Sequence, residues 1–185
     1  MFYSALIHRA LDYAARTHEG QYRKNPEAVI PYVSHCAMVG LILQRAGFDE
    51  EVVAAGILHD TCEDRGVDRT ELAELFGERI ADLVLDVSEE DRSLPWKERK
   101  RRYLDRLRSA QPEAIAISVA DKIHNLYSLL ASLETGAEIW NRMKRGRHEQ
   151  IERFEEIADF LRESFDHPLR QEFMEILDLL KKKTG

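Results

Sequence analysis

The sequence predicts an all-α fold, a helical bundle of about eight helices with no sheet. Apolar residues recur at three- and four-residue intervals along most of the chain, which is the period of a helix. No segment shows the apolar–polar alternation of a half-buried strand. With 185 residues, of which 44% are hydrophobic and 33% charged, the chain can bury one core. We therefore expect a single domain over residues 1–185.

The first helices are indicated by their spacing and their ends. Leu6, Ala10 and Ala14 lie on one face of an amphipathic helix, which is interrupted by charges and is therefore not a signal peptide. A polar loop is expected over 19–31. A second helix is expected over 31–46, because a proline suits its first turn and a glycine follows its end.

The later helices are delimited in the same way. A third helix is expected from Asp49, and two short helices separated by Gly77 follow it. A polar linker at 88–95 is too short to divide the chain into domains. The remaining helices are expected over 96–108, 112–133, 148–164 and 168–182. We expect the final helices, within 136–185, to close the bundle behind a motif-bearing core at 5–135.

Composition argues against several classes of protein. The net charge of -7 does not suit a general binder of nucleic acids or of anionic membranes. No apolar run approaches the roughly 20 residues of a membrane span. Cys36 and Cys62 are too few for a disulfide framework, so a reducing compartment is the default. We therefore expect a cytoplasmic protein with no nucleic-acid or membrane partner.

The segment LHDTCED, at 58–64, concentrates side chains that can bind metals, and no cation follows until Arg65. On a continuous helix, the histidine and the three carboxylate side chains of this segment share one arc of the helix surface, and apolar side chains occupy the opposite arc. Gly56 lies one turn earlier in the polar arc, where a missing side chain leaves space for a bound group. Crowded acids repel each other unless a cation or solvent intervenes, so a cation site and a solvated acidic face are the alternatives. The four side chains are His59, Asp60, Glu63 and Asp64.

Two other segments offer partners for a metal ion. His35 lies near the start of the second helix, and Asp121 follows a run of small and apolar residues. A carboxylate in such surroundings is costly unless it is paired or metal-bound, so a salt bridge is the alternative for Asp121. His35 alone would indicate a hydrogen-bonded core histidine. Together with His59 and Asp60, these residues form a mixed nitrogen and oxygen set that suits Mn²⁺, Fe²⁺ or Zn²⁺.

Other polar residues near Asp121 are less specific. Asn125 lies one turn later on the same face and could bond a ligand or a backbone group. His124 points some 60° to the other side, and we expect it to support the site from outside. The remaining histidines show no local partners and are assigned no chemistry. They are His8, His18, His148 and His167.

Taken in order, these motifs resemble the HD-domain metal-dependent phosphohydrolases. More narrowly, they resemble the guanosine-3′,5′-bis(diphosphate) 3′-pyrophosphohydrolases of the RelA/SpoT type and the small alarmone hydrolases. The resemblance spans about residues 5 to 135 and implies the HD-domain helical bundle. It is carried by Arg-Lys at 23–24, Pro-Tyr with His at 31–35, His-Asp-x-x-Glu-Asp at 59–64 and Ala-Asp-Lys-x-His-Asn at 120–125.

The resemblance implies a role for each residue in the hydrolysis of (p)ppGpp to GDP or GTP and pyrophosphate. Glu63 and Asp64 would position and activate the attacking water. Arg23 would pack on or contact the nucleotide, Lys24 would lie near its phosphates, and Asn125 would contact its sugar and phosphate. One Mn²⁺ would be held by His35, His59, Asp60 and Asp121.

Two features leave the substrate open. Tyr127 stands where family members often carry arginine, and the loop at 25–30 also departs from the pattern; both are expected to line the base pocket. A basic stretch at 92–108 can add positive charge for phosphates, although most of it fits a solvated helix face. The alternatives are an HD phosphohydrolase of another phosphorylated nucleotide or cofactor, such as a nucleoside monophosphate or NADPH, and a non-catalytic helical regulatory module.

Overall fold

A computed structural model describes residues 4–24, 28–89, 93–135, 139–142 and 145–184, and the described chain is a helical bundle. Its only pairing of extended segments in these ranges is an isolated bridge between Tyr22 and Pro31. This confirms the predicted all-α class. The helices are α1 (Ala5–Thr17), α2 (Val33–Arg45), α3 (Glu50–Leu58), α4 (Thr61–Arg65), α5 (Arg69–Phe76), α6 (Glu78–Val87), α7 (Trp96–Ser109), α8 (Pro112–Glu134), the 3-10 helix η1 (Ile139–Arg142), α9 (Arg147–Ser164) and α10 (Pro168–Thr184).

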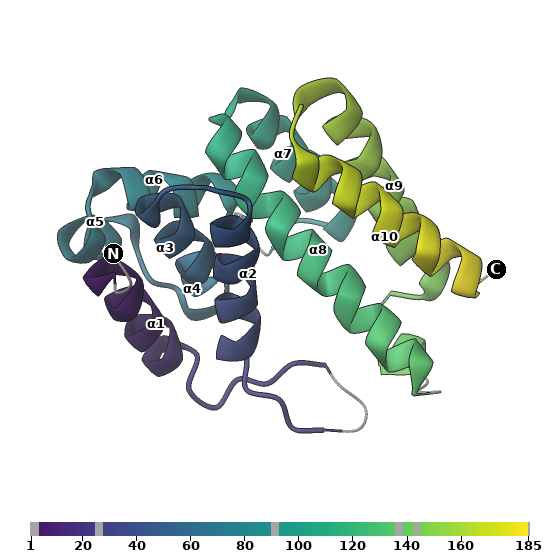
Figure 1. Ribbon diagram of the computed structural model, residues 1–185, viewed down its shortest axis with the longest axis horizontal. Helices are drawn as coiled ribbons and strands as arrows, with labels where there is room; N and C mark the ends of the chain where they lie inside the picture. Colours follow the sequence, from purple (N-terminus) through teal and green to yellow (C-terminus); the bar gives the residue numbers. More distant parts are fainter. Residues whose placement is uncertain (1–3, 25–27, 90–92, 136–138, 143–144, 185) are drawn as a thin grey trace.

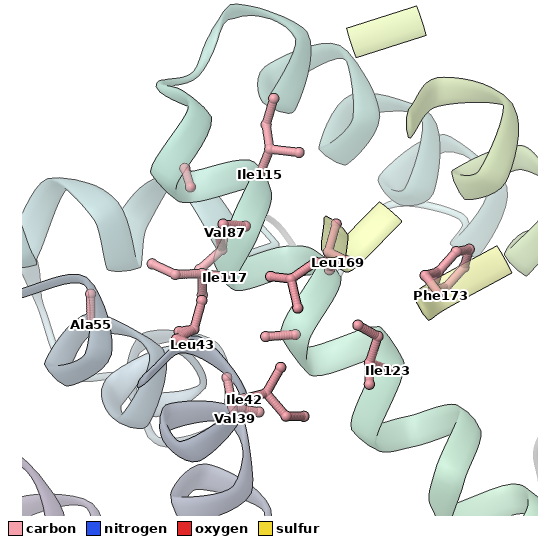
Figure 2. Packing of buried hydrophobic residues seen from close by; sticks show 14 of the residues in the cluster. Val39, Ile42, Leu43, Ala55, Val87, Ile115, Ile117, Ile123, Leu169 and Phe173 are labelled. Carbon is pink, nitrogen blue, oxygen red and sulfur yellow. The ribbon is translucent and has the colours of Figure 1, made fainter. Parts of the chain in front are cut away.

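The long helix α8 is the central element of the bundle (Figure 1). It packs against α2, α3 and α6, which come from the N-terminal half of the chain, and against α10, the last helix. Figure 2 shows the apolar side chains that meet around it, among them Leu43 of α2, Ile117 and Ile123 of α8, and Phe173 of α10. Among the described helices, none combines the length and apolar character that a membrane span requires.

Several helix ends follow the signals in the sequence. The hydroxyl of Ser4 accepts a hydrogen bond from the amide of Ile7 at the start of α1. Asp49 and Asp68 cap α3 and α5 in the same way, and each such cap typically stabilises a helix by about 1 kcal/mol. Gly77 separates α5 from α6 with a φ of 98°, a conformation that favours glycine.

The main departure from expectation is a break inside the LHDTCED segment. The prediction of one helix running through the segment is wrong: α3 ends at Leu58, and α4 begins at Thr61. Two side chains take carbonyl groups that a continuous helix would pair with amides. Thr61 Oγ1 donates to the carbonyl of Leu58 at 2.7 Å, and His59 Nδ1 donates to that of Gly56 at 2.8 Å. The chain therefore turns at His59 and Asp60.

Gly56 faces the core and leaves no space for a bound group, so that expectation is also wrong. A Cβ atom added to Gly56 would lie 2.3 Å from Leu43 Cδ1, on α2. Gly40 on α2 is matched to α3 in the same manner, since its added Cβ would lie 2.6 Å from Ile57 Cγ1. The two glycines allow α2 and α3 to pack closely, which fixes the position of the turn that follows α3.

Candidate active site

Three of the four expected metal ligands, His35, His59 and Asp121, form one cluster where α2, the turn after α3 and α8 come together, and Asp60 lies against its two histidines. The ligand atoms of His35, His59 and Asp121 all lie within 4.8 Å of one another. His35 Nε2 is 3.3 Å from His59 Nε2 and 3.2 Å from Asp121 Oδ1. Asp60 Oδ2 is 2.9 Å from His59 Nε2. Because ligands about 2.1 Å from one cation lie about 3 to 4 Å apart, this spacing fits a single divalent metal ion.

The hydrogen bonds of the two rings also fit a metal site. A carbonyl only accepts, so His59 Nδ1 donates to Gly56, and the Nε2 atom faces the carboxylates with a lone pair once it gives up its proton. His35 Nδ1 lies 2.6 Å from His124 Nδ1. Burial, with His35 and Arg23 nearby, lowers the pKa of His124 to about 4, so this ring is neutral and can accept from His35. Both ligand rings can thus present a lone pair at Nε2.

The carboxylates make the site attractive to a cation. Burial of the His59 ring opposes its protonation, yet the neighbouring charges of Asp60 and Asp121 raise the pKa of His59 to about 9. A field that holds a proton so firmly also favours a divalent ion, which carries twice the charge. The donor atoms of the site and its negative charge therefore both favour a divalent cation.

Asp121 is buried and has both kinds of partner that its sequence context allows. Its Oδ2 atom forms an ion pair with Lys122, while its Oδ1 atom faces His35 and accepts from Asn125 Nδ2 at 2.5 Å. Burial alone would raise the pKa of Asp121, but Lys122 and the two histidines hold that pKa well below its ordinary value. The salt bridge considered as an alternative is therefore present in addition to the metal-ligand geometry.

Glu63 and Asp64 project from α4, just after the ligand pair. Glu63 Oε2 accepts a hydrogen bond from the backbone amide of Glu89 at 3.2 Å. Burial, and then the carboxylates of Glu89 and Asp60, raise the pKa of Glu63, which suits a group that takes up a proton. Asp64 Oδ2 accepts from Gln21 Nε2 at 2.6 Å.

A cleft of about 1120 Å³ opens beside Asp64, between the 21–34 segment, α7, α8 and α9. Asp64 is the one acid among the described residues that line it, whereas the cations are numerous. A cleft lined by one sign of charge concentrates ligands of the opposite sign, here anions such as phosphates. The lining cations are Arg23, Lys24, Arg99, Lys100, Lys122, Arg145 and Arg153.

The three expected substrate contacts all line this cleft. Arg23 Nη2 donates to Asn125 Oδ1 at 2.7 Å, and the Arg23 guanidinium lies 5.6 Å from the centre of the Tyr32 ring. Lys24 is exposed beside it. The structure thus brings Arg23, Lys24 and Asn125 to one surface. This surface adjoins the ligand cluster, because Asn125 also bonds Asp121.

Two expectations about side chains are wrong. Tyr127 does not line the cleft and is half-exposed, because two residues beyond Asn125 a helix has turned about 200°. Three of the four histidines that were expected to lack local partners have one: His18 Nδ1 lies 2.9 Å from Gln21 Oε1, His8 Nε2 lies 3.4 Å from Asp12 Oδ2, and His167 Nδ1 accepts from the amide of Leu169 at 3.2 Å. In the loop at 25–30, residues 25–27 lie outside the described chain, and Ile30 lines the cleft.

Several residues at the site were not singled out from the sequence. Tyr32 OH donates to Asp60 Oδ2 at 2.5 Å, Lys122 pairs with Asp121, and Gln21 holds Asp64. Tyr32 and Lys122 lie inside the family motifs and Gln21 lies two residues before Arg23-Lys24, and these positions are the signal that could have identified them. Arg153 is 6% exposed and reaches the cleft from α9, where no local pattern indicates it.

Comparisons with known proteins agree with this geometry. Residues 10–145 match the family model of the HD domain. The guanosine-3′,5′-bis(diphosphate) 3′-pyrophosphohydrolase MESH1 of Danio rerio is 36% identical over 128 residues, or 68% of this chain and 70% of that protein. MESH1 of Mus musculus is 38% identical over 135 residues, or 72% and 74%. A solved structure described as a metazoan ortholog of SpoT that hydrolyzes ppGpp superposes with a TM-score of 0.82 and 31% identity, covering 97% of this chain and 98% of that one.

Proposed function

This chain belongs to the HD-domain family, and we propose that it is a (p)ppGpp 3′-pyrophosphohydrolase. It would use one water to release the 3′-diphosphate as pyrophosphate, leaving GDP or GTP. The observation that carries the proposal is a metal-ligand cluster next to a cationic cleft, because the cleft is lined by Tyr32, His124 and Lys122, which bond Asp60, His35 and Asp121. Relatives that bear the name of this activity cover more than two thirds of the chain.

We assign the metal to His35, His59, Asp60 and Asp121, and Mn²⁺ is the ion we propose. A mixed set of imidazoles and carboxylates suits this ion among others. When bound, it would supply positive charge next to the phosphate and lower the pKa of a coordinated water. Tyr32 and His124 would support the ligands from outside, by their bonds to Asp60 and His35.

Glu63 and Asp64 are the groups we assign to the attacking water. Both follow the ligand pair on α4, and neither belongs to the ligand set. The raised pKa of Glu63 makes its carboxylate a better proton acceptor than an ordinary glutamate. Asp64 is held by Gln21 at the edge of the cleft, where it can orient the water.

The cleft is the proposed nucleotide site. Arg23, Lys24 and Asn125 line one part of it, and Arg153 of α9 lines another part. Its cations suit a substrate with two diphosphate groups better than one with a single phosphate. Because α9 contributes to the wall, we also propose that residues 1–185 act as one domain, in which the C-terminal helices do more than close the bundle.

The test is incubation of manganese-loaded protein with ppGpp, followed by anion-exchange separation of the products. We expect GDP and pyrophosphate, with Glu63→Ala as an inactive control that still binds metal. Orthophosphate released from NADPH or nucleoside monophosphates, with ppGpp left intact, would support the alternative phosphohydrolase. A protein that binds no transition metal and turns over none of these compounds would indicate a regulatory module.

A further inference from the structure

A chain of side chains leads from the buried His18 to the catalytic carboxylate of Asp64. His18 Nδ1 lies 2.9 Å from Gln21 Oε1, and Gln21 Nε2 donates to Asp64 Oδ2 at 2.6 Å. His18 is 3% exposed and follows the last residue of α1, whereas Asp64 belongs to α4. The contacts therefore connect two segments that are far apart in the sequence.

The chemistry of the groups fixes the direction of every bond in this chain. A carboxylate oxygen without a proton only accepts, so the amide NH₂ of Gln21 must face Asp64 and its carbonyl oxygen must face His18. His18 must then carry its proton on Nδ1 in order to donate to that oxygen. The Nε2 atom of His18 is buried and has no hydrogen-bond partner among the described residues, so it supplies no competing arrangement.

The backbone of residues 17–21, which carries His18 and Gln21, is also held by hydrogen bonds. Arg65, the neighbour of Asp64, donates from Nε to the carbonyl of Thr17 and from Nη2 to that of Glu19, both at 2.5 Å. The amide of Tyr32 donates to the carbonyl of Gln21 at 2.9 Å. Hydrogen bonds thus tie residues 17–21 to α4 and to Tyr32, which is what a positioning role requires.

We propose that Gln21 and His18 are positioning residues that set the orientation of the Asp64 carboxylate for the attacking water. This inference rests on the proposed function, because the role of Asp64 belongs to it. The bond to Gln21 restrains rotation of the carboxylate, and the bond from His18 keeps the amide from flipping. Small errors in the placement of a catalytic group can lower a rate by about 100-fold.

The first test is the kinetics of Gln21 variants. Gln21→Ala is expected to lower kcat about 10- to 100-fold, with KM and metal affinity within about twofold of wild type. Gln21→Glu keeps the shape but places a second carboxylate against Asp64, so its kcat should fall at least as far. Gln171→Ala, on the exposed face of α10, is the matched control and should leave kcat unchanged. Normal kcat in Gln21→Ala would overturn the inference.

The second test separates hydrogen bonding from packing at His18. His18→Ala is expected to lower kcat about tenfold. His18→Asn carries an amide nitrogen near the place of Nδ1 and should restore most of that loss. His8→Ala, on the exposed part of α1, is the matched control. If the asparagine variant were no better than the alanine variant, the donated hydrogen bond would not be the cause.

The third test does not depend on turnover. Ring ¹⁵N shifts of the metal-free protein should show the Nδ1–H tautomer for His18, and Gln21→Ala should change them. A wild type that shows this coupling but leaves ppGpp intact would refute the proposed function and uphold the hydrogen-bonded chain. An Nε2–H tautomer in the wild type would refute the chain, whatever the activity.

Discussion

The turn after α3 and the middle of α8 each deliver residues to the same site by different means. On α8 the helix is unbroken, and Asp121 and Asn125 come together because they are four residues apart. His59 and Asp60 are adjacent, and on a continuous helix they would point about 100° apart. The helix stops there, Asp60 takes a φ of -96° and a ψ of 0°, and its carboxylate reaches the His59 ring at 2.9 Å.

This difference shows what a break in a helix can contribute to a site. Helical spacing can place only residues three or four apart on one line, whereas a turn can direct two neighbours to one point. The turn is held from behind by the closely packed glycines of α2 and α3. The face of α3 that packs on α2 and the end of α3 that leads to His59 and Asp60 therefore have separate roles, and each can be tested by itself.

The largest effect is expected from removing a proposed metal ligand from either region, the turn after α3 or the middle of α8. Asp60→Ala and Asp121→Ala should both lose bound manganese and lower turnover on the order of 1000-fold. Metal content by mass spectrometry and a ppGpp assay measure the two effects. Glu63→Ala should lose a similar share of turnover but keep its metal, and a Glu63→Ala protein with near-normal activity would contradict the assigned role.

The next effect tests the face of α3 that packs on α2. Gly56→Ala places a methyl group against Leu43, and overpacking of this kind costs about 1 to 3 kcal/mol of unfolding free energy. Urea denaturation measures the loss. Gly146→Ala, whose added Cβ meets nothing within 4 Å, is the control and should lose less. Equal losses would mean that α2 and α3 have room for a methyl group at Gly56.

How much of this could be foreseen differs between the two regions. The site on α8 followed from helical periodicity, so Asp121 and Asn125 were placed correctly relative to each other. The break after α3 was missed because it depends on side chains bonding backbone carbonyls, which periodicity does not register. The face of Gly56 was wrongly assigned for the same reason that Arg153 was missed. Both depend on how different helices pack against one another, which periodicity along a single helix does not register.

A smaller effect is expected from the residues that support the ligands. Tyr32→Phe removes the hydroxyl bonded to Asp60, on the turn side, and Asn125→Ala removes the amide bonded to Asp121, on the α8 side. Loss of such a partner weakens metal binding by about 10- to 100-fold. Calorimetric titration with Mn²⁺ compares the two. If only Asn125→Ala weakened binding, the turn would not need its support from Tyr32.

The smallest effect sets the baseline. Arg101 pairs with Glu98 and Asp105 on the exposed face of α7, outside both regions. Exposed pairs of this kind are screened by solvent and contribute little, so Arg101→Ala should change the unfolding free energy and kcat very little. A large loss of kcat in this variant would show that the assays respond to substitutions far from the site.

Soaking crystals of the protein with Mn²⁺ and recording anomalous diffraction tests the central claim most directly. We expect one strong anomalous peak within about 2.0 to 2.4 Å of His35 Nε2, His59 Nε2 and the carboxylates of Asp60 and Asp121. A peak at another place, or a peak that leaves out either the 59–60 turn or Asp121, would contradict the convergence of the two regions on one ion.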